Sequence, residues 1–310
     1  MRIASIDIGT NTVLLLVADV DAEGVLHAVG HEQRFPRLGK NVDARKMIQP
    51  EGFSRLEAIL KEYSAISKQL GAERIVACAT SAVRDAANRE EFLRILKEKT
   101  GIQIEVLSGE DEALWSYRGA IGGLNIDPHK AAVLDIGGGS TEITYYSQKP
   151  GSEEKELRKY SFQLGSVRIT EKFLKHDPPL PIELMWAKDF IFKEYQKFPA
   201  WDTSNYILIG VAGTVTTLAC LEQSLKQFDV EKVSGYVLDK RAVNMWLKRL
   251  SGLTNDRILT LSETTEGRAD ILTAGTLILS CFMEHFGFSR VLTSERGLRY
   301  GLVMREWERR

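Results

Sequence analysis

Two segments of the chain place an aspartate two residues before a glycine, each time between apolar, strand-like residues. The first pairs Asp7 with Gly9, and the second pairs Asp135 with Gly137. Glycine lets backbone amides come close to an anion, and a carboxylate beside that anion requires a cation between them. The two copies lie about one domain length apart. The repeat therefore predicts two related domains whose turns handle phosphate, with phosphate transfer or hydrolysis as the chemistry.

The first turn adds short polar side chains to its glycine. Thr10 and Asn11 follow Gly9 directly and would donate hydrogen bonds to phosphate oxygens, while Asp7 implies Mg²⁺. A plain hairpin with aspartate and glycine as turn residues explains this segment alone equally well. A carboxylate flanked by two isoleucines is a poor solvated turn residue, however, and the second copy favours the phosphate interpretation.

The second turn holds three successive glycines, beginning with Gly137 and Gly138, between two apolar strands. Glycines weaken strands, so this run indicates that the backbone must approach another group closely. Ser140 follows as a donor to phosphate, and Asp135 and Glu142 could hold a hydrated Mg²⁺. The alternative is a loose glycine-rich loop.

A third small-residue turn and one arginine extend the phosphate interpretation. Gly213 and Thr214 follow an apolar strand and begin a helix, and helix N-termini attract anions. The alternative is ordinary strand–helix packing with threonine as a cap. Arg84 follows another buried strand, where it would bind phosphate oxygens or form a surface ion pair with Asp85 or Glu91.

Glu112 is the candidate general base. It lies with Glu110 and Asp111 in the first turn of an expected helix, where the helix dipole alone favours acids. The five histidines and three cysteines form no catalytic or metal-binding pattern, so a carboxylate is the natural group to activate water. Glu112 lies one turn inside the start of this helix and directly precedes apolar residues.

Composition indicates an ordinary globular protein. The chain has 310 residues, of which 44% are hydrophobic and 27% charged, with a net charge of −1. This net charge gives no sign of a polyanionic partner, and we expect no nucleic-acid partner. Cys78, Cys220 and Cys281 lie far apart in apolar runs, as reduced core residues do. Because we find no signal peptide and no apolar run long enough to span a bilayer, we expect a cytoplasmic protein without membrane association.

The order of the expected elements indicates an α/β fold that is built twice. Three strands are followed by helix, strand, helix, strand and helix over residues 1–124, and the same order recurs over residues 125–310. We therefore predict an N-terminal and a C-terminal domain with these bounds, and leave open whether the last helix, about 298–310, packs back on the first domain. The segment 125–127 is the expected hinge for domain closure.

Together these motifs resemble those of the exopolyphosphatase / guanosine pentaphosphate phosphatase family, within the actin-like ATPase and sugar-kinase superfamily. The resemblance covers nearly the whole chain and rests on segments in a fixed order: Asp7–Thr12, Ala79–Arg84, Val106–Glu112, Asp135–Glu142, Leu164–Arg168, Gly210–Thr214, Gly267–Ile271 and Gly297–Gly301. It implies two ribonuclease-H-like domains with the active site in the cleft between them.

The resemblance also implies a cofactor and roles for single residues. Glu112, after the Ser-Gly segment, takes the position of the family's base. Mg²⁺ would bind Asp135 and Glu142, with Asp7 as a further candidate. The family's phosphate contacts fall on Gly9, Thr10, Asn11, Arg84, Gly137, Gly138 and Ser140.

Two features depart from the family. Leu114 stands where an arginine is common two places after the base, which removes a charge. Longer members continue into a helical C-terminal domain that helps to bind long polymers, so short chains fit this sequence better.

The expected activity is Mg²⁺-dependent release of orthophosphate from the end of inorganic polyphosphate, with short chains favoured. Hydrolysis of guanosine pentaphosphate to the tetraphosphate is the nearest alternative, because both substrates end in a phosphoanhydride. A sugar or acid kinase would usually have an aspartate base where this chain has Glu112. A non-catalytic sensor of guanosine alarmones or polyphosphate is a different class, against which the intact Glu112, Asp135 and Glu142 argue. The sequence leaves open whether the protein forms a homodimer.

Overall fold

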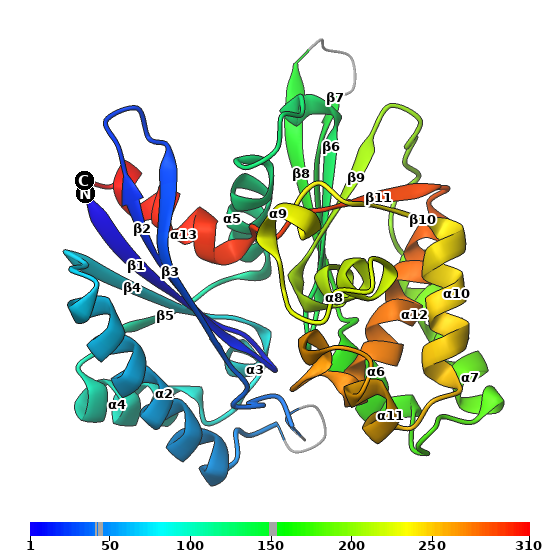
Figure 1. Ribbon diagram of the computed structural model, residues 1–310, viewed down its shortest axis with the longest axis horizontal. Coiled ribbons are helices and arrows are strands. Elements are labelled where there is room, and N and C mark those ends of the chain that lie inside the picture. Colours follow the sequence, from blue (N-terminus) through cyan, green and yellow to red (C-terminus); the bar gives the residue numbers. More distant parts are fainter. Residues whose placement is uncertain (41, 43–45, 149–153) are drawn as a thin grey trace. The chain divides into compact units, whose positions relative to one another are not determined.

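The computed structural model describes residues 1–40, 42, 46–148 and 154–310, which form two compact units (Figure 1). The first unit is Met1–Gly119 with Gly297–Arg310, and the second is Ala120–Arg296. The division falls inside helix α5 (Gly109–Ile121), and not at the expected boundary between residues 124 and 125. The second unit is also shorter than the expected 125–310, because the last helix belongs to the first unit.

The first unit contains a five-stranded sheet with the order β3-β2-β1-β4-β5. Its strands are β1 (Arg2–Ile8), β2 (Val13–Val20), β3 (Leu26–Arg34), β4 (Arg74–Ala79) and β5 (Ile104–Val106). β1, β2 and β3 are antiparallel neighbours, whereas β4 runs parallel to β1 and β5 runs parallel to β4. Since parallel strands end at the same edge of a sheet, the segments that follow β1, β4 and β5 are brought together.

Local sequence signals set the helix boundaries of this unit. Its helices are α2 (Pro50–Gln69), α3 (Ser81–Arg84), α4 (Arg89–Thr100), α5 and α13 (Leu298–Glu308). Pro50 occupies the first turn of α2, where a missing N–H is tolerated. Gly101, at φ 72, ends α4 in the left-handed conformation. Ser108 Oγ accepts a hydrogen bond from the Asp111 amide at 3.0 Å and caps α5.

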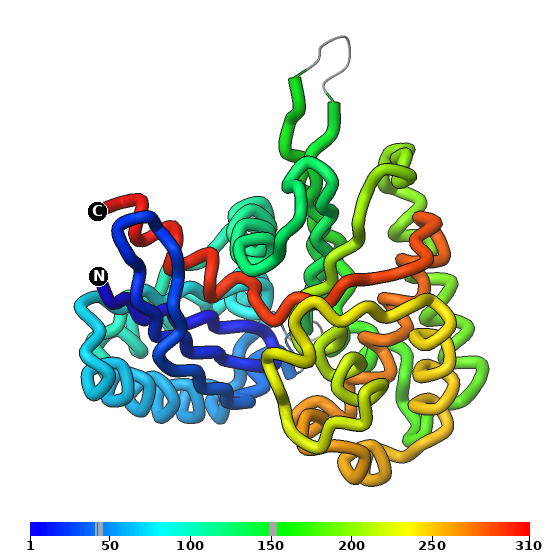
Figure 2. Tube along the Cα trace, turned by 45° about the horizontal axis from the view of Figure 1, so that its top comes forward, coloured from blue at the N-terminus to red at the C-terminus, as the bar shows by residue number. Residues whose placement is uncertain are grey.

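Alternation along β1 sends its side chains to two different layers. Ile6 and Ile8 lie in a core with residues of α2 and α4. Ile3 lies in a second apolar cluster with Tyr300 and Val303 of α13, and this helix runs along β1 and β2 (Figure 2). The apolar face of α13 is thus the physical reason why the last helix belongs to the first unit.

The second unit repeats the arrangement in a six-stranded sheet with the order β10-β11-β9-β6-β7-β8. Its strands are β6 (Ala131–Ile136), β7 (Thr141–Gln148), β8 (Lys155–Phe162), β9 (Ile207–Val211), β10 (Val237–Asp239) and β11 (Arg290–Thr293). The strands β8-β7-β6-β9-β11 have the same order and directions as β3-β2-β1-β4-β5. β10 adds an antiparallel edge strand that the sequence pattern misses, because its 3 residues are too few for a periodic signal.

The core of the second unit is organised around helix α12 (Ala269–His285), which is buried along most of its length and contacts α6, α7, α8 and α10. The other helical segments are η1 (Pro128–Lys130), α6 (Ser166–Phe173), α7 (Pro181–Tyr195), α8 (Ala212–Glu222), α9 (Val230–Val233), α10 (Lys240–Ser251), α11 (Asn255–Leu259) and η2 (Glu263–Thr265). Two sheets with matching strand orders confirm the expected α/β fold built twice. Among the described residues, no helix is long and apolar enough to cross a membrane.

Candidate active site

β1 and β6 end in turns of the same construction. The first turn runs from Gly9 to Thr12, and the Gly9 amide donates to the Thr12 carbonyl at 2.9 Å. The glycine turn runs from Gly137 to Ser140, and the Gly137 amide donates to the Ser140 carbonyl at 3.0 Å. A Cβ on either glycine would lie 3.0 Å from that carbonyl oxygen, closer than side chains normally approach. The two copies of the sequence pattern are therefore two copies of one backbone structure.

In the first turn, the carbonyl groups of Thr10 and Asn11 accept hydrogen bonds from the loop that follows β3. The Gly39 amide donates to Thr10 O at 2.8 Å, and the Arg37 amide donates to Asn11 O at 3.1 Å. In a trans peptide the N–H and the C=O point in opposite directions. The amides that share these peptides consequently face away from the loop, as a backbone nest for an anion requires.

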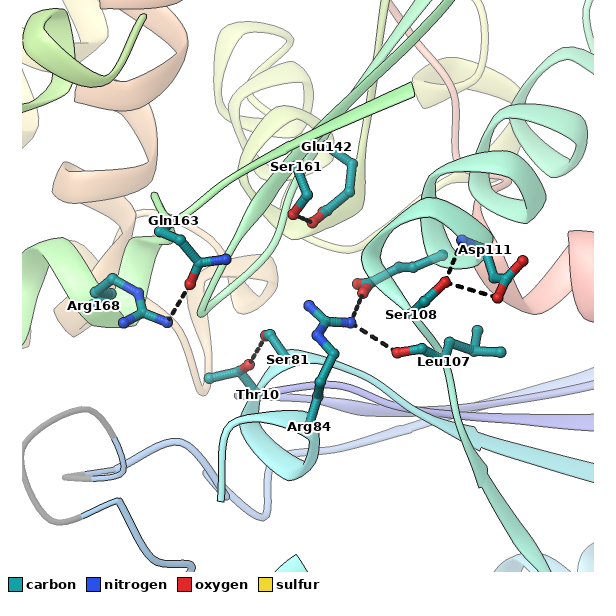
Figure 3. Close-up of polar contacts among 11 residues, drawn as sticks. Thr10, Ser81, Arg84, Leu107, Ser108, Asp111, Glu142, Ser161, Gln163 and Arg168 are labelled. Atoms are coloured by element: carbon teal, nitrogen blue, oxygen red, sulfur yellow. Dashed lines mark hydrogen bonds and ion pairs between the residues drawn. The ribbon is translucent and has the colours of Figure 1, made fainter. Parts of the chain in front are cut away.

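Thr10 is held by a second hydroxyl group. Its Oγ1 is 2.8 Å from Ser81 Oγ, and both side chains are buried (Figure 3). Ser81 begins α3, two residues after the last residue of β4, which is the parallel neighbour of β1, so Thr10 and Ser81 meet at the same edge of the sheet. Sequence reasoning misses Ser81 because only the pairing of β1 with β4 reveals its position.

Arg84 and Glu112 form an ion pair in the first unit. Arg84 Nη1 donates to Glu112 Oε2 at 2.9 Å. It also donates to the Leu107 carbonyl at 3.0 Å (Figure 3). The pair forms because β4 and β5 are parallel neighbours and each leads into the helix that carries one partner. Glu112 is only 8% exposed. Arginine at this distance stabilises an ionised carboxylate, which is the form that a general base must have.

In the second unit, Asp135, Glu142 and Ser161 form a row across three antiparallel strands. Asp135 of β6 lies opposite Glu142 of β7, and Glu142 lies opposite Ser161 of β8. Residues in such opposed positions have their side chains on one face of the sheet. Ser161 Oγ donates to Glu142 Oε1 at 2.7 Å, and Glu142 is 2% exposed (Figure 3). Ser161, which the sequence does not single out, therefore orients this carboxylate.

The carboxylates of this row suit a cation that is shared with a substrate. Within the described residues, no group of three His, Cys, Asp or Glu side chains could hold a metal ion. Mg²⁺ commonly keeps several waters and binds through one or two carboxylates together with substrate phosphates. Asp135 and Glu142 supply that number of carboxylates on one sheet face. Asp7 belongs to the first unit, and its place in the metal site remains a prediction.

The turn that contains Gly213 and Thr214 lies beside the guanidinium group of Arg268. Gly213 and Thr214 lie in the first turn of α8, and Arg268 Nη1 donates to the Gly213 carbonyl and to Thr217 Oγ1, both at 3.1 Å. Burial lowers the pKa of the Arg268 guanidinium to about 10. Ala212 adopts φ 66, a strained left-handed conformation for a residue with a side chain. Sequence reasoning misses Arg268, and phosphate binding by Gly213 and Thr214 remains a prediction.

Comparison with known proteins decides the family. A family model described as the Ppx/GppA phosphatase family matches residues 16–310. The chain belongs to the Ppx/GppA phosphatase family. It is 34% identical to Exopolyphosphatase 2 of Mycobacterium tuberculosis, over 98% of this chain and 98% of the relative. It is also 31% identical to the Bifunctional 3-dehydroquinate synthase/phosphatase of Fusobacterium nucleatum, over 97% of this chain but 46% of that protein.

Solved structures of Ppx/GppA proteins share the fold. The crystal structure of an exopolyphosphatase-like protein has a TM-score of 0.92 and 30% identity, and the match covers 99% of this chain and 98% of that one. The family member from Aquifex aeolicus has a TM-score of 0.80 and 31% identity, with coverage of 100% and 98%. These matches confirm the expected family, the duplicated α/β fold and a hydrolase that acts on phosphoanhydride bonds.

Proposed function

We propose that this Ppx/GppA phosphatase is a Mg²⁺-dependent exopolyphosphatase that releases orthophosphate from the end of inorganic polyphosphate. The observation that carries the proposal is the Arg84–Glu112 pair, a shielded carboxylate of the kind that activates water. Polyphosphate as substrate is supported by the full-length similarity to Exopolyphosphatase 2 of Mycobacterium tuberculosis.

Glu112 would act as the base. Arg84 Nη1 donates to Glu112 Oε2 at 2.9 Å, and the Glu112 carboxylate would accept a proton from the attacking water. Water would attack the terminal phosphorus in line with the bridging oxygen, whose bond to that phosphorus breaks as the shortened chain leaves. The backbone amides of both turns would stabilise the phosphoryl oxygens, since preorganised N–H donors favour developing negative charge.

Further residues would bind the metal ion and the phosphate groups. Asp135 and Glu142 would hold Mg²⁺, with Asp7 as a further candidate, and the metal ion when bound offsets the negative charge of the phosphates. The phosphate contacts would be Gly9, Thr10, Asn11, Arg84, Gly137, Gly138, Ser140, Gly213 and Thr214. We also propose that the enzyme prefers short polyphosphate chains and that it is cytoplasmic. The free, buried cysteines suit a reducing compartment such as the cytoplasm.

The test is orthophosphate release by the purified protein with Mg²⁺ on short polyphosphate, long polyphosphate, guanosine pentaphosphate and ATP, measured side by side. Fastest release from short polyphosphate would support the proposal in full. Preference for guanosine pentaphosphate would contradict the substrate and assign the same residues to an alarmone phosphatase. Binding without release from any of them would contradict the enzyme and favour a sensor.

The base is tested by Glu112→Gln, with Glu110→Gln as the matched control. Glu112→Gln should lower kcat about 10²- to 10⁴-fold, the usual contribution of general acid–base catalysis. Glu110 lies in the same helical turn but is exposed, so Glu110→Gln should retain wild-type turnover. Full turnover in Glu112→Gln would remove Glu112 from the mechanism, whatever the substrate.

A further inference from the structure

Three carbonyl groups of the glycine turn, those of Gly137, Gly138 and Gly139, accept hydrogen bonds from the start of helix α6. The Ser166 amide donates to Gly137 O at 2.9 Å, and the next two amides of α6 donate to Gly138 O at 2.9 and 3.2 Å. Gly139 O accepts a hydrogen bond from Arg168 Nε at 2.8 Å. One short helix therefore fixes the direction of three successive peptide groups.

The opposite side of these peptides presents their N–H groups. Because N–H and C=O point in opposite directions in a trans peptide, the amides of Gly138, Gly139 and Ser140 face away from α6. In the described part of the chain, none of these three amides donates a hydrogen bond to a main-chain carbonyl group. Successive amides that converge in this way form a nest for one anion. The first-turn amides of α6 are already engaged, so the nest lies in the turn and not at the helix start.

The three peptides are held by bonds of different kinds. The carbonyls of Gly137 and Gly138 accept from main-chain amides, which almost any residue of α6 would supply. No main-chain amide within the described residues donates to Gly139 O, which is held by the side chain of Arg168. Arg168 Nη2 donates in turn to Gln163 Oε1 at 3.3 Å, which helps to fix the guanidinium plane (Figure 3). The orientation of the Ser140 amide thus depends on the identity of residue 168.

We propose that Arg168 is a positioning residue for phosphate binding. Its Nε–H fixes the peptide between Gly139 and Ser140, so that three consecutive amides bind the same phosphate group. The inference rests on the proposed function, because that phosphate belongs to the substrate or to the orthophosphate product. It goes beyond the proposed function by assigning a role to a residue that need not touch the substrate.

Three substitutions separate orientation from charge. Arg168→Gln retains an N–H donor, because glutamine Nε2 is the same number of bonds from Cα as arginine Nε. Arg168→Lys retains the positive charge but has a methylene at that position, and Arg168→Met has neither. Arg158→Met is the matched control, since Arg158 Nε bonds to Ser147 Oγ on the β7–β8 hairpin and its side chain is 46% exposed.

Steady-state kinetics on polyphosphate should give a pattern that a merely structural role would not. Losing one well-oriented amide to a charged phosphate should raise KM about tenfold or more in Arg168→Met and Arg168→Lys. The KM of Arg168→Gln should remain within about threefold of the wild-type KM. In all three Arg168 variants kcat should change less than KM, and Arg158→Met should have the kcat and KM of wild type. Unchanged thermal unfolding would show that the fold is retained.

Binding of inorganic phosphate, measured by isothermal titration calorimetry on the same proteins, keeps this test apart from the proposed function. Weaker phosphate binding in Arg168→Met, restored in Arg168→Gln, would support the inference even where wild type released nothing from polyphosphate. Wild-type KM and phosphate affinity in Arg168→Met would overturn it. The inference would also be overturned if Arg168→Lys had the KM and phosphate affinity of wild type while Arg168→Gln bound as weakly as Arg168→Met. In that case the positive charge alone would explain the effect.

Discussion

Replacing Gly165 by alanine should damage the glycine turn more than the fold. Gly165 precedes α6, and a Cβ on it would lie 2.3 Å from Gly138 O and 2.4 Å from the carbonyl carbons of Gly138 and Gly139. Ordinary van der Waals contact begins at 3.4 Å. One of the two backbones must therefore move by about 1 Å to relieve the overlap. Main-chain atoms lie on both sides, so no flexible side chain can absorb this movement.

This displacement sets the expected magnitudes. Misplacing the groups that position a substrate by about 1 Å lowers a rate about 10²-fold. Forcing an extra methyl group into a packed site lowers the free energy of unfolding by about 1–3 kcal/mol. We therefore expect Gly165→Ala to reduce kcat/KM for orthophosphate release about 100-fold while the protein remains folded. Steady-state phosphate release and chemical denaturation of the same preparation measure the two quantities.

Gly252→Ala is the control for Gly165→Ala. Gly252 follows α10 at φ −97, and a Cβ there would make only ordinary contacts of 3.7 and 3.8 Å. Its activity should equal that of wild type, and its free energy of unfolding should change by about 0.5 kcal/mol at most. Wild-type kcat/KM in Gly165→Ala would refute the reasoning, because it would show that the turn tolerates a backbone shift or plays no part in the reaction.

Two further predictions concern single carboxylates. Ser161→Ala removes the hydrogen bond to Glu142 Oε1 and should weaken metal binding about tenfold or more. Titration with Mn²⁺, followed by electron paramagnetic resonance, measures the affinity for the metal ion. An unchanged Mn²⁺ affinity would contradict the prediction. Burial raises the pKa of Glu183, but hydrogen bonds from His176 and from the amides of Leu180, Lys175 and His176 outweigh this and lower the pKa to about 2 from 4.5. A carboxyl group whose pKa is lower in the folded protein stabilises the fold at pH values above its unfolded pKa, and this stabilisation is lost as pH falls toward about 2. Thermal unfolding should therefore show Glu183→Gln to be less stable than wild type at pH 7, with a difference that shrinks below about pH 4.5. A stability difference that does not depend on pH would contradict this prediction.

Most of the fold is predictable because its signals are local. The apolar strands around Asp7 and Asp135, Pro50 at a helix start and Gly101 at a helix end all act through their own backbone conformation or periodicity. The domain bounds are less predictable, because the place of α13 depends on its contacts with β1 and β2, far away in the sequence. The candidate base Glu112 and the two glycine-containing turns are predictable for the same reason. Acidic residues at a helix start and runs of glycine are patterns within a single short segment of the sequence.

The partners of these site residues are not predictable from one sequence. Arg84 reaches Glu112 through the pairing of β4 with β5, whereas the sequence suggests the neighbouring acids Asp85 and Glu91. Ser161 reaches Glu142 through the pairing of β7 with β8. Arg168 gains its role from the approach of α6 to the glycine turn. Each of these depends on strand register or helix placement, which composition and spacing do not determine.

The position of α13 also affects how the protein is made. Ile3 of β1 and Leu16 of β2 are covered by Tyr300 and Val303 of α13. Domains usually fold in the order of their synthesis, but here the whole second unit is translated before this covering helix exists. The second unit can therefore complete its core while the first still exposes an apolar sheet face. We expect nascent chains to expose this face to chaperones until α13 has left the ribosome.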